Sequence, residues 1–416
     1  MSVSSLVPFA VLCVVFTLIA VRKIGRNRIE IWQAMTLGAA AVLLTGQIPP
    51  VDALLSINLD VILFLFGMFV VGEAMLRSGY LQQLTQRMFG RARRLDELVL
   101  LILFLMGAIS AIVMNDTVAI IGTPVVLFLS RVHGVRAKPL LLTLAFAVTT
   151  GSVMSPIGNP QNLLVALDGG IQSPFVVFFW YLALPSLINL LIAFVFIRLV
   201  YRKEFGVQLQ PLPPLTQSDG RLVLLSKVSL AIVMILIGLK VTLLFIAPWF
   251  EMRLTYIALI AALPVLLFSD RRREVLRNID WKTLVFFAAM FILMESVWES
   301  GFFQELVLLL NADLTSPTVI MVVGVLLSQL ISNVPLVALY LPLIVESGAS
   351  IPQLMALASG STIAGNMLIL GAASNVIIIQ NAEKEGATLT FAEFAKIGIP
   401  LTLIQVLVYL LFLPVS

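Results

Sequence analysis

The chain has 416 residues, of which 60% are hydrophobic and only 12% are charged, with a net charge of +4. Soluble domains carry about 25% charged residues, so this composition excludes an ordinary soluble protein. Apolar runs of roughly 16 to 25 residues recur along the chain, and a helix of that length crosses a bilayer. The sequence therefore predicts an all-α polytopic membrane protein.

Several classes of function are excluded by what the chain lacks. Its one cysteine, Cys13, rules out a disulfide or a thiolate metal cluster within the chain. Its one histidine, His133, lies in RVHGVRAK and is expected to be a solvated loop residue. No HExxH or GxSxG motif is present, so no enzyme, cofactor or bound metal is predicted. The basic residues cluster in short loops, which indicates membrane topology rather than a nucleic-acid partner.

The predicted spans follow from the apolar runs and the positive charges. Two apolar stretches, 97–131 and 316–346, are each about the length of two half-crossings, and we expect them to be re-entrant hairpins. With that choice, nearly all basic loops fall on one side, the cytoplasm. The chain is then expected in a prokaryotic plasma (inner) membrane with both termini extracytoplasmic. The ten predicted full crossings lie near 5–21, 31–46, 61–77, 139–167, 174–199, 223–247, 254–269, 282–299, 352–381 and 393–414.

The two halves of the sequence repeat each other. Residues 68–84, MFVVGEAMLRSGYLQQL, align without gaps on residues 290–306, MFILMESVWESGFFQEL, with seven of seventeen positions identical. Further on, GNPQN at 158–162 aligns on GAASN at 371–375. Five crossings per half is an odd number, so we predict two inverted-topology repeats, typical of secondary transporters. The predicted parts are repeat 1 (1–202), a cytoplasmic linker (203–222) and repeat 2 (223–416).

Four polar breaks interrupt the apolar runs, two in each half. The predicted broken helices, 139–167 and 352–381, contain SPIGNPQN and GAASN, and the hairpins contain NDT and SNVP. Irregular backbone at membrane depth is tolerated only where protein buries it or it lines a watery cavity. We therefore expect the breaks to converge on one solute site. Its predicted substrate-binding residues are Asn115, Thr117, Gly158, Asn159, Gln161, Asn162, Ser332, Asn333, Gly371, Ser374 and Asn375.

Asp116 is the one carboxylate in these four breaks. A charged side chain at the bilayer centre is costly and is usually functional, as a proton carrier or a cation ligand. Its partner in the repeat is Val334, so the predicted site is chemically asymmetric. We therefore expect Asp116 to carry the coupling ion, either H⁺ or Na⁺.

The motifs NDT, SPIGNPQN, SNVP and GAASNVIIIQNAEKEG resemble those of the ion transporter superfamily. It includes arsenite permeases (ArsB), NhaD-type Na⁺/H⁺ antiporters and, more remotely, citrate/dicarboxylate transporters. The resemblance covers nearly the whole chain and implies two hairpins, two broken helices and alternating access. Hairpin-tip residues bind Na⁺ and substrate in the dicarboxylate branch, which here implies Asn115, Asp116, Thr117, Ser332 and Asn333. Asp116 and Pro335 depart from the dicarboxylate pattern.

Three transported solutes remain open from the sequence. The leading prediction is proton-coupled efflux of arsenite or antimonite, because amides and hydroxyls suit a neutral trihydroxy solute. The alternatives are transport of a small anion, such as a dicarboxylate, sulfate or phosphate, and Na⁺/H⁺ antiport. A carboxylate in the site repels an anionic solute. Binding of an anion therefore requires that the solute is protonated or pairs with a co-transported cation. Expected partners are the solute, the coupling ion and the lipid bilayer; a homodimer and a cytoplasmic ATPase subunit are compatible additions.

Overall fold

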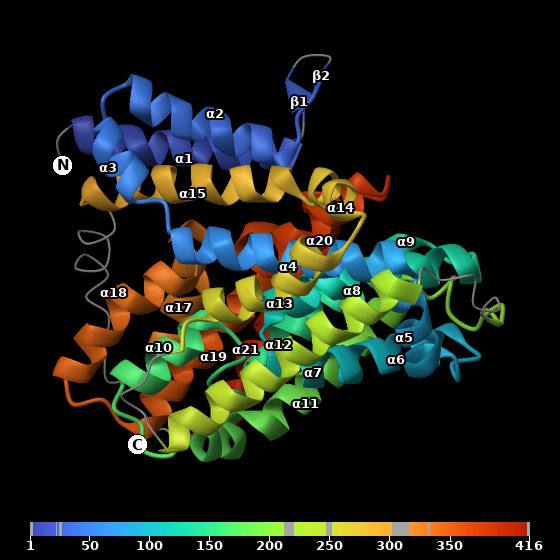
Figure 1. Ribbon diagram of the computed structural model, residues 1–416. Coiled ribbons are helices and arrows are strands. Elements are labelled where there is room, and N and C mark those ends of the chain that lie inside the picture. Colours follow the sequence, from blue (N-terminus) through green and yellow to red (C-terminus); the bar gives the residue numbers. More distant parts are fainter. Residues whose placement is uncertain are drawn as a thin grey trace. The chain divides into compact units, whose positions relative to one another are not determined.

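The computed structural model describes residues 3–21, 23–24, 27–211, 220–246, 252–301, 316–331 and 333–413. These residues are helical apart from loops and one short antiparallel pair, β1 (Lys23–Ile24) with β2 (Asn27–Arg28). The chain divides into two compact units, each built from parts of both sequence halves (Figure 1). Unit 1 is Met1–Ser78 with Asp219–Ala312, and unit 2 is Gly79–Ser218 with Asp313–Ser416.

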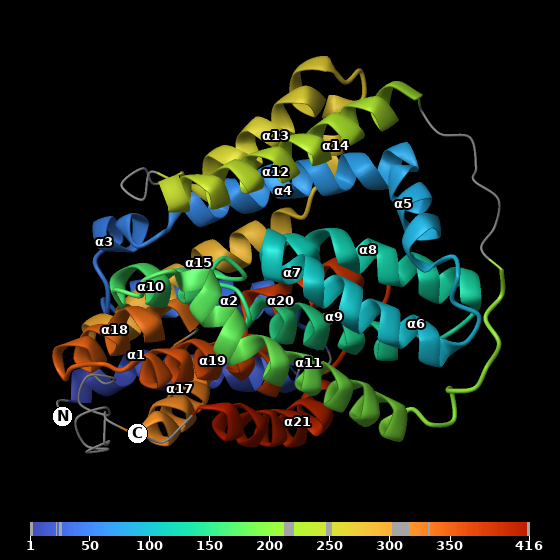
Figure 2. The same ribbon diagram turned by 90° about the horizontal axis from the view of Figure 1, so that it is seen from below.

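Unit 1 pairs helices from the first half with helices from the second. In it, α4 packs along α13 and α12, and α15 packs along α2 and α1 (Figures 1 and 2). The helices of unit 1 are α1 (Val3–Val21), α2 (Ile31–Leu44), α3 (Pro50–Leu55), α4 (Leu59–Ser78), α12 (Gly220–Ile246), α13 (Leu254–Phe268), α14 (Arg272–Asn278) and α15 (Trp281–Glu299).

Unit 2 holds every polar break that the sequence singles out. Its first-half helices are α5 (Tyr80–Phe89), α6 (Leu95–Leu101), a π-helical turn η1 (Ile102–Met106), α7 (Gly107–Val113), α8 (Asn115–His133), α9 (Ala137–Ser152), α10 (Pro160–Asp168) and α11 (Pro174–Val200). Its second-half helices are α17 (Pro317–Ile331), α18 (Asn333–Glu346), α19 (Ile351–Met367), the 3₁₀ turn η2 (Ile369–Gly371), α20 (Ala373–Lys384) and α21 (Phe391–Phe412).

The centre of unit 2 is formed by α9 and α19, which pack against each other. Every residue from Pro139 to Ser152 of α9 is buried, and so is every residue from Gln353 to Asn366 of α19. These helices carry many small and hydroxyl side chains, which let backbones approach closely and bond across helices. The central layer of unit 2 is therefore fully buried and partly polar.

Contacts between two helices have counterparts between the corresponding helices of the other sequence half. In unit 1, α4 on α13 corresponds to α15 on α2, and α1 on α2 corresponds to α12 on α13. In unit 2, α8 packs on α20 just as α18 packs on α10, and α7 packs on α9 just as α17 packs on α19. This correspondence is what two structural repeats would produce. Their opposite orientation in a membrane stays a prediction, as does the division into repeats at residues 202 and 223.

The predicted helical membrane architecture is confirmed in its coarse form. Seven helices in the described residues are long and apolar enough to cross a membrane, and several shorter ones are apolar too. Most predicted spans begin and end within about three residues of a helix. The short helices α3, α5 and α14 were not predicted, because six to ten residues give too little periodicity to detect.

Candidate functional site

The first broken helix is interrupted between Ser152 of α9 and Pro160 of α10. Asn159 ends the break in an extended conformation, and its side-chain oxygen accepts a hydrogen bond from the backbone N–H of Asn162 at 2.8 Å. Asn is a favoured N-cap and Pro is favoured at the first helical position, so α10 begins where these residues place it. The interruption predicted at SPIGNPQN is therefore present.

The second broken helix is interrupted between Met367 of α19 and Ala373 of α20. The backbone N–H of Gly371 donates to the carbonyl of Leu368 at 3.0 Å, as that of Gly158 donates to Ser155 at 3.2 Å in the first break. Both breaks thus contain the same kind of backbone turn, and the turns end at the aligned glycines of GNPQN and GAASN.

Gly158 and Gly371 are required by close backbone approach. A Cβ atom at Gly158 would lie 2.1 Å from the carbonyl oxygen of Ser152, and one at Gly371 would lie 2.5 Å from that of Ala364. We expect Gly158→Ala and Gly371→Ala each to destabilise the protein by about 2–3 kcal/mol, measured by thermal unfolding in detergent. Gly238→Ala, where a Cβ meets nothing within 4 Å, is the control and should leave stability unchanged or slightly raised. Equal behaviour of all three variants would contradict the close-approach argument.

The first hairpin tip lies at Met114, where α7 ends and α8 begins. Met114 has φ 73° and ψ 142°, a strained conformation for a residue with a side chain, and such residues cluster at functional sites. The backbone N–H of Asn115 donates to the carbonyl of Gly158 at 2.9 Å, so the tip is docked on the first break. Asn115, Asp116 and Thr117 form the first turn of α8 rather than the turn itself, which corrects the predicted position of the tip.

The second hairpin tip lies between Ile331, the end of α17, and Asn333, the start of α18. Asn333 is buried, and its side-chain oxygen has no hydrogen-bond partner in the described residues. Ser332, a predicted site residue, lies outside the described residues. Both helix pairs therefore break where polar motifs occur, while their re-entry from one side of a membrane stays a prediction.

A closed set of hydrogen bonds joins the first break to α19. The hydroxyl of Thr362 donates to the Asn162 side-chain oxygen at 3.0 Å and accepts from Asn159 at 3.2 Å and Gln161 at 3.4 Å. The Asn162 amide also donates to the carbonyl of Ser152 at 3.2 Å, and Asn159 donates to the Ser152 hydroxyl at 3.1 Å. All of these side chains are buried. Their polar groups are thus largely satisfied within the protein, as expected of a structural network.

The second break has the same geometry but leaves its polar groups open. In the register that aligns 158–162 on 371–375, Asn375 corresponds to Asn162 and Thr149 to Thr362. The Asn375 amide donates to the carbonyl of Gly365, as the Asn162 amide donates to Ser152. However, the Asn375 side-chain oxygen and the Thr149 hydroxyl are buried and have no hydrogen-bond partner in the described residues. The bond equivalent to Thr362–Asn162 is therefore not formed.

Two more buried polar atoms, on helices α8 and α20, also lack hydrogen-bond partners in the described residues. They are Oδ1 of Asp116, at the start of α8, and the hydroxyl of Ser374, at the start of α20. The helices α8, α9 and α20, which carry these residues together with Thr149 and Asn375, all pack on one another (Figures 1 and 2). We call Asp116, Thr149, Ser374 and Asn375 the open polar group.

Several polar residues of this region were missed by the sequence analysis. Thr149 and Thr362 lie in helix interiors, where a threonine gives no local signal; only the repeat alignment relates them. Gln329 of α17 donates to the carbonyl of Ala364 at 2.8 Å, and its oxygen would lie 2.8 Å from a Cβ at Gly371. A second network joins three helices through Thr150, Asn366 and Gln405, with Asn366 donating to Gln405 at 2.8 Å.

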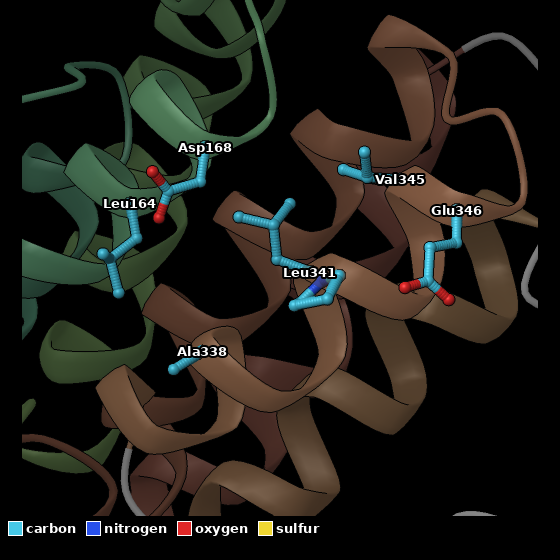
Figure 3. A pocket seen from close by; sticks show the side chains of 7 residues that line it. Leu164, Asp168, Ala338, Leu341, Val345 and Glu346 are labelled. Atoms are coloured by element: carbon cyan, nitrogen blue, oxygen red, sulfur yellow. The ribbon is translucent and has the colours of Figure 1, made fainter.

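A groove of about 360 Å³ lies between α10 and α18. Figure 3 shows Leu164 and Asp168 of α10 facing Leu341 of α18 across it. Both helices begin at a polar break and both end at an acidic residue, Asp168 or Glu346. The groove therefore runs between two helices whose inner ends belong to the breaks.

Similarity to known proteins agrees with a transporter. The sequence profile of the citrate transporter family, CitMHS, matches residues 12–353. The chain belongs to this family. The ion transporter superfamily, whose motifs the sequence resembles, includes citrate transporters, so the resemblance is confirmed at the level of the superfamily. A closer relation to its arsenite permease or NhaD branches finds no support.

The chain is also similar to several individual proteins and to one solved structure. It is 26% identical to a 46 kDa membrane protein of Mycobacterium leprae, with 97% of this chain and 96% of that protein aligned. It is 23% identical to the P protein of Homo sapiens over 98% of this chain and 59% of that protein. A crystal structure of the YdaH transporter of Alcanivorax borkumensis aligns with 14% identity and a TM-score of 0.48, covering 99% of this chain and 97% of that one.

The family assignment fixes the coarse function. This citrate transporter family member is a multi-pass membrane transporter, and several of its relatives are named as transporters. Arsenite efflux, the leading prediction, has no support among them, and the small-anion alternative agrees better with the family. The coupling ion, a homodimer, an ATPase subunit and the orientation of the termini stay predictions.

Proposed function

We propose that this transporter moves a small carboxylate-type anion across the membrane by alternating access, together with a cation bound at Asp116. The observation that carries the proposal is the open polar group: on three helices that pack together, each of its four side chains has a buried polar atom with no hydrogen-bond partner in the described residues. Burying polar groups without hydrogen bonds costs about 1–3 kcal/mol each, so a retained set of them is expected to have ligands. Asn115 and Thr117, beside Asp116 at the start of α8, and Asn333, at the start of α18, are proposed to complete the site.

The chemistry of the open polar group suits a cation and an anion bound side by side. Asp116 and Asn375 present oxygen atoms that can be ligands for Na⁺, and the Asp116 carboxylate can instead take up a proton. Thr149 and Ser374 present hydroxyls, which donate hydrogen bonds to a carboxylate. The N-terminus of α20, at Ala373, adds a favourable dipole for an anion. The cation neutralises Asp116, so the carboxylate no longer repels the anionic solute.

The closed network around Thr362 is proposed to be structural rather than solute-binding. Asn159, Gln161 and Asn162 are predicted site residues, but each donates a side-chain hydrogen bond within the protein. A solute would have to displace those bonds, whereas the open polar group needs no such exchange. This moves the proposed site toward the second break.

The test is uptake into proteoliposomes that contain the purified chain. Labelled citrate is supplied with an inward proton gradient, an inward sodium gradient or neither, and unlabelled succinate, sulfate and phosphate serve as competitors. We expect one of the gradients to accelerate citrate uptake and at least one competitor to inhibit it. Arsenite movement is measured in parallel. Transport of arsenite without transport of citrate would overturn the proposal and restore the metalloid prediction.

A further inference from the structure

A second hollow in unit 2 lies away from the polar breaks, at the end of α11. It has a volume of about 740 Å³ and is lined by Gly134–Arg136, between α8 and α9, by Leu199–Glu204 and by Val207. We call it the α11 recess. The positive charges of the loops place it on the predicted cytoplasmic side. His133, beside it, is buried and bonds the carbonyl of Gln210 at 2.6 Å, which corrects its expected position as a solvated residue.

The α11 recess carries surplus positive charge. Three neighbouring basic residues are neutralised: Arg136 pairs with Glu204 at 3.3 Å, Arg198 with Asp96 at 3.2 Å, and Lys138 with Glu393. Arg202 and Lys203 are exposed and make no ion pair within the part of the chain that the structure describes. Two adjacent cations in a recess are therefore available to an anion from outside the chain.

An exposed apolar stripe on α11 leads directly into the recess. Leu187, Leu191, Val195 and Leu199 are all exposed and follow one another at a spacing of four residues, so they share one side of the helix. The stripe is about 18 Å long, at 1.5 Å per residue. Half of a bilayer's hydrocarbon core is about 15 Å thick. The stripe is thus long enough for one lipid acyl chain, and exposed apolar residues continue from it along α11 as far as Val176. Its other end adjoins Arg202 and Lys203.

Tyr201 adds a hydrogen-bond donor at the same level. It follows the last residue of α11 and is partly buried. Burial, with the nearby carboxylates of Glu393 and Glu204, raises the pKa of the Tyr201 phenol to about 12. The phenol therefore keeps its proton at neutral pH and can donate it to a phosphate oxygen. Tyrosine is also enriched at the level of lipid headgroups.

We propose that the α11 recess binds an anionic phospholipid, with its headgroup phosphate at Arg202 and Lys203 and an acyl chain along the α11 stripe. Basic pockets at the cytoplasmic ends of membrane helices are suited to anionic headgroups. The apolar stripe distinguishes a lipid from a free anion, because a free anion gains nothing from Leu187 to Leu199. The site is separate from the solute site and does not rest on the proposed transport activity.

The test measures lipid retention by the purified full chain. Native mass spectrometry in detergent is used to titrate phosphatidylglycerol against phosphatidylcholine. We expect phosphatidylglycerol to bind in preference, and the variant Arg202→Gln/Lys203→Gln to bind it about tenfold more weakly. The control Arg272→Gln/Arg273→Gln removes an equally adjacent and exposed basic couple in unit 1 that makes no ion pair within the described residues, and it should leave phosphatidylglycerol binding unchanged.

Two further measurements separate the lipid from other ligands. Leu191→Asn/Leu199→Asn should weaken phosphatidylglycerol binding while leaving both basic residues in place. Inorganic phosphate and glycerol 3-phosphate should not raise the unfolding temperature of the protein. Equal effects of the two basic double variants would overturn the site. Stabilisation by phosphate alone, with no effect of the stripe variant, would overturn the lipid as its occupant.

Discussion

Asp116→Asn is expected to abolish cation-driven uptake while the protein remains folded. Asparagine keeps the size and hydrogen-bonding shape of the carboxyl group but carries no charge and cannot take up or release a proton. Since Oδ1 of Asp116 has no hydrogen-bond partner in the described residues, the substitution breaks no contact there. We expect gradient-driven uptake to fall about tenfold or more, with an unfolding temperature within a few degrees of wild type.

The matched control is Asp168→Asn, which neutralises an exposed carboxylate at the outer end of α10. It removes the same charge outside the open polar group and should leave coupling intact. Exchange of labelled solute across membranes without any gradient is measured for both variants. Full gradient-driven uptake by Asp116→Asn would remove this carboxylate from the coupling step. Loss of folding in that variant would instead point to a structural carboxylate.

Thr149→Val and Thr362→Val form the second decisive comparison, because the two threonines are related by the repeat. Valine has nearly the shape of threonine without its hydroxyl. Thr362 donates to the Asn162 oxygen and accepts from the Gln161 amide, so the loss of its hydroxyl leaves both of these buried groups without that partner. We expect Thr362→Val to lower the free energy of unfolding by about 2–3 kcal/mol. Thr149→Val breaks no bond in the described residues and should leave stability unchanged.

The affinity for the solute should be affected more by Thr149→Val than by Thr362→Val, the reverse of the order for stability. If the Thr149 hydroxyl donates to the solute, Thr149→Val loses a hydrogen bond to a charged group, about 1.5–3 kcal/mol or roughly 10-fold or more in KM. Thr362→Val should change KM less than Thr149→Val does. Both quantities are measured on the same preparations, by initial uptake rates and by thermal unfolding. Matching profiles for the two variants would refute the distinction between an open and a closed set.

Most of the fold could be predicted because its signals are local. The spans follow from apolar length, and the breaks follow from Pro156, Gly158 and Pro160 in an otherwise apolar segment. The start of α10 is likewise set by Asn159 and Pro160, a cap and a first-turn residue. Such features depend on neighbours a few residues away. The helices therefore begin and end close to where the sequence alone places them.

The position of the first hairpin tip and the short helices could not be predicted from the sequence. The tip falls on Met114, a residue with no preference for positive φ, because the docking of Asn115 on Gly158 fixes the backbone there. That bond joins the start of α8 to the break between α9 and α10. A tertiary contact thus decides a local conformation that residue preferences oppose.

The sequence by itself determined that this protein is a helical membrane transporter with two similar halves and four polar breaks. Hydrophobic length, proline, glycine and internal similarity carry that information along the chain. Only the tertiary structure decided how the halves interleave into two units and which of the equivalent polar groups are paired. Thr362 and Asn159 meet across 203 residues, whereas the hydroxyl of the equivalent Thr149 has no hydrogen-bond partner among the residues that the structure describes. Hydrogen bonds act over about 3 Å, and the packing of α8, α9, α19 and α20 sets those distances.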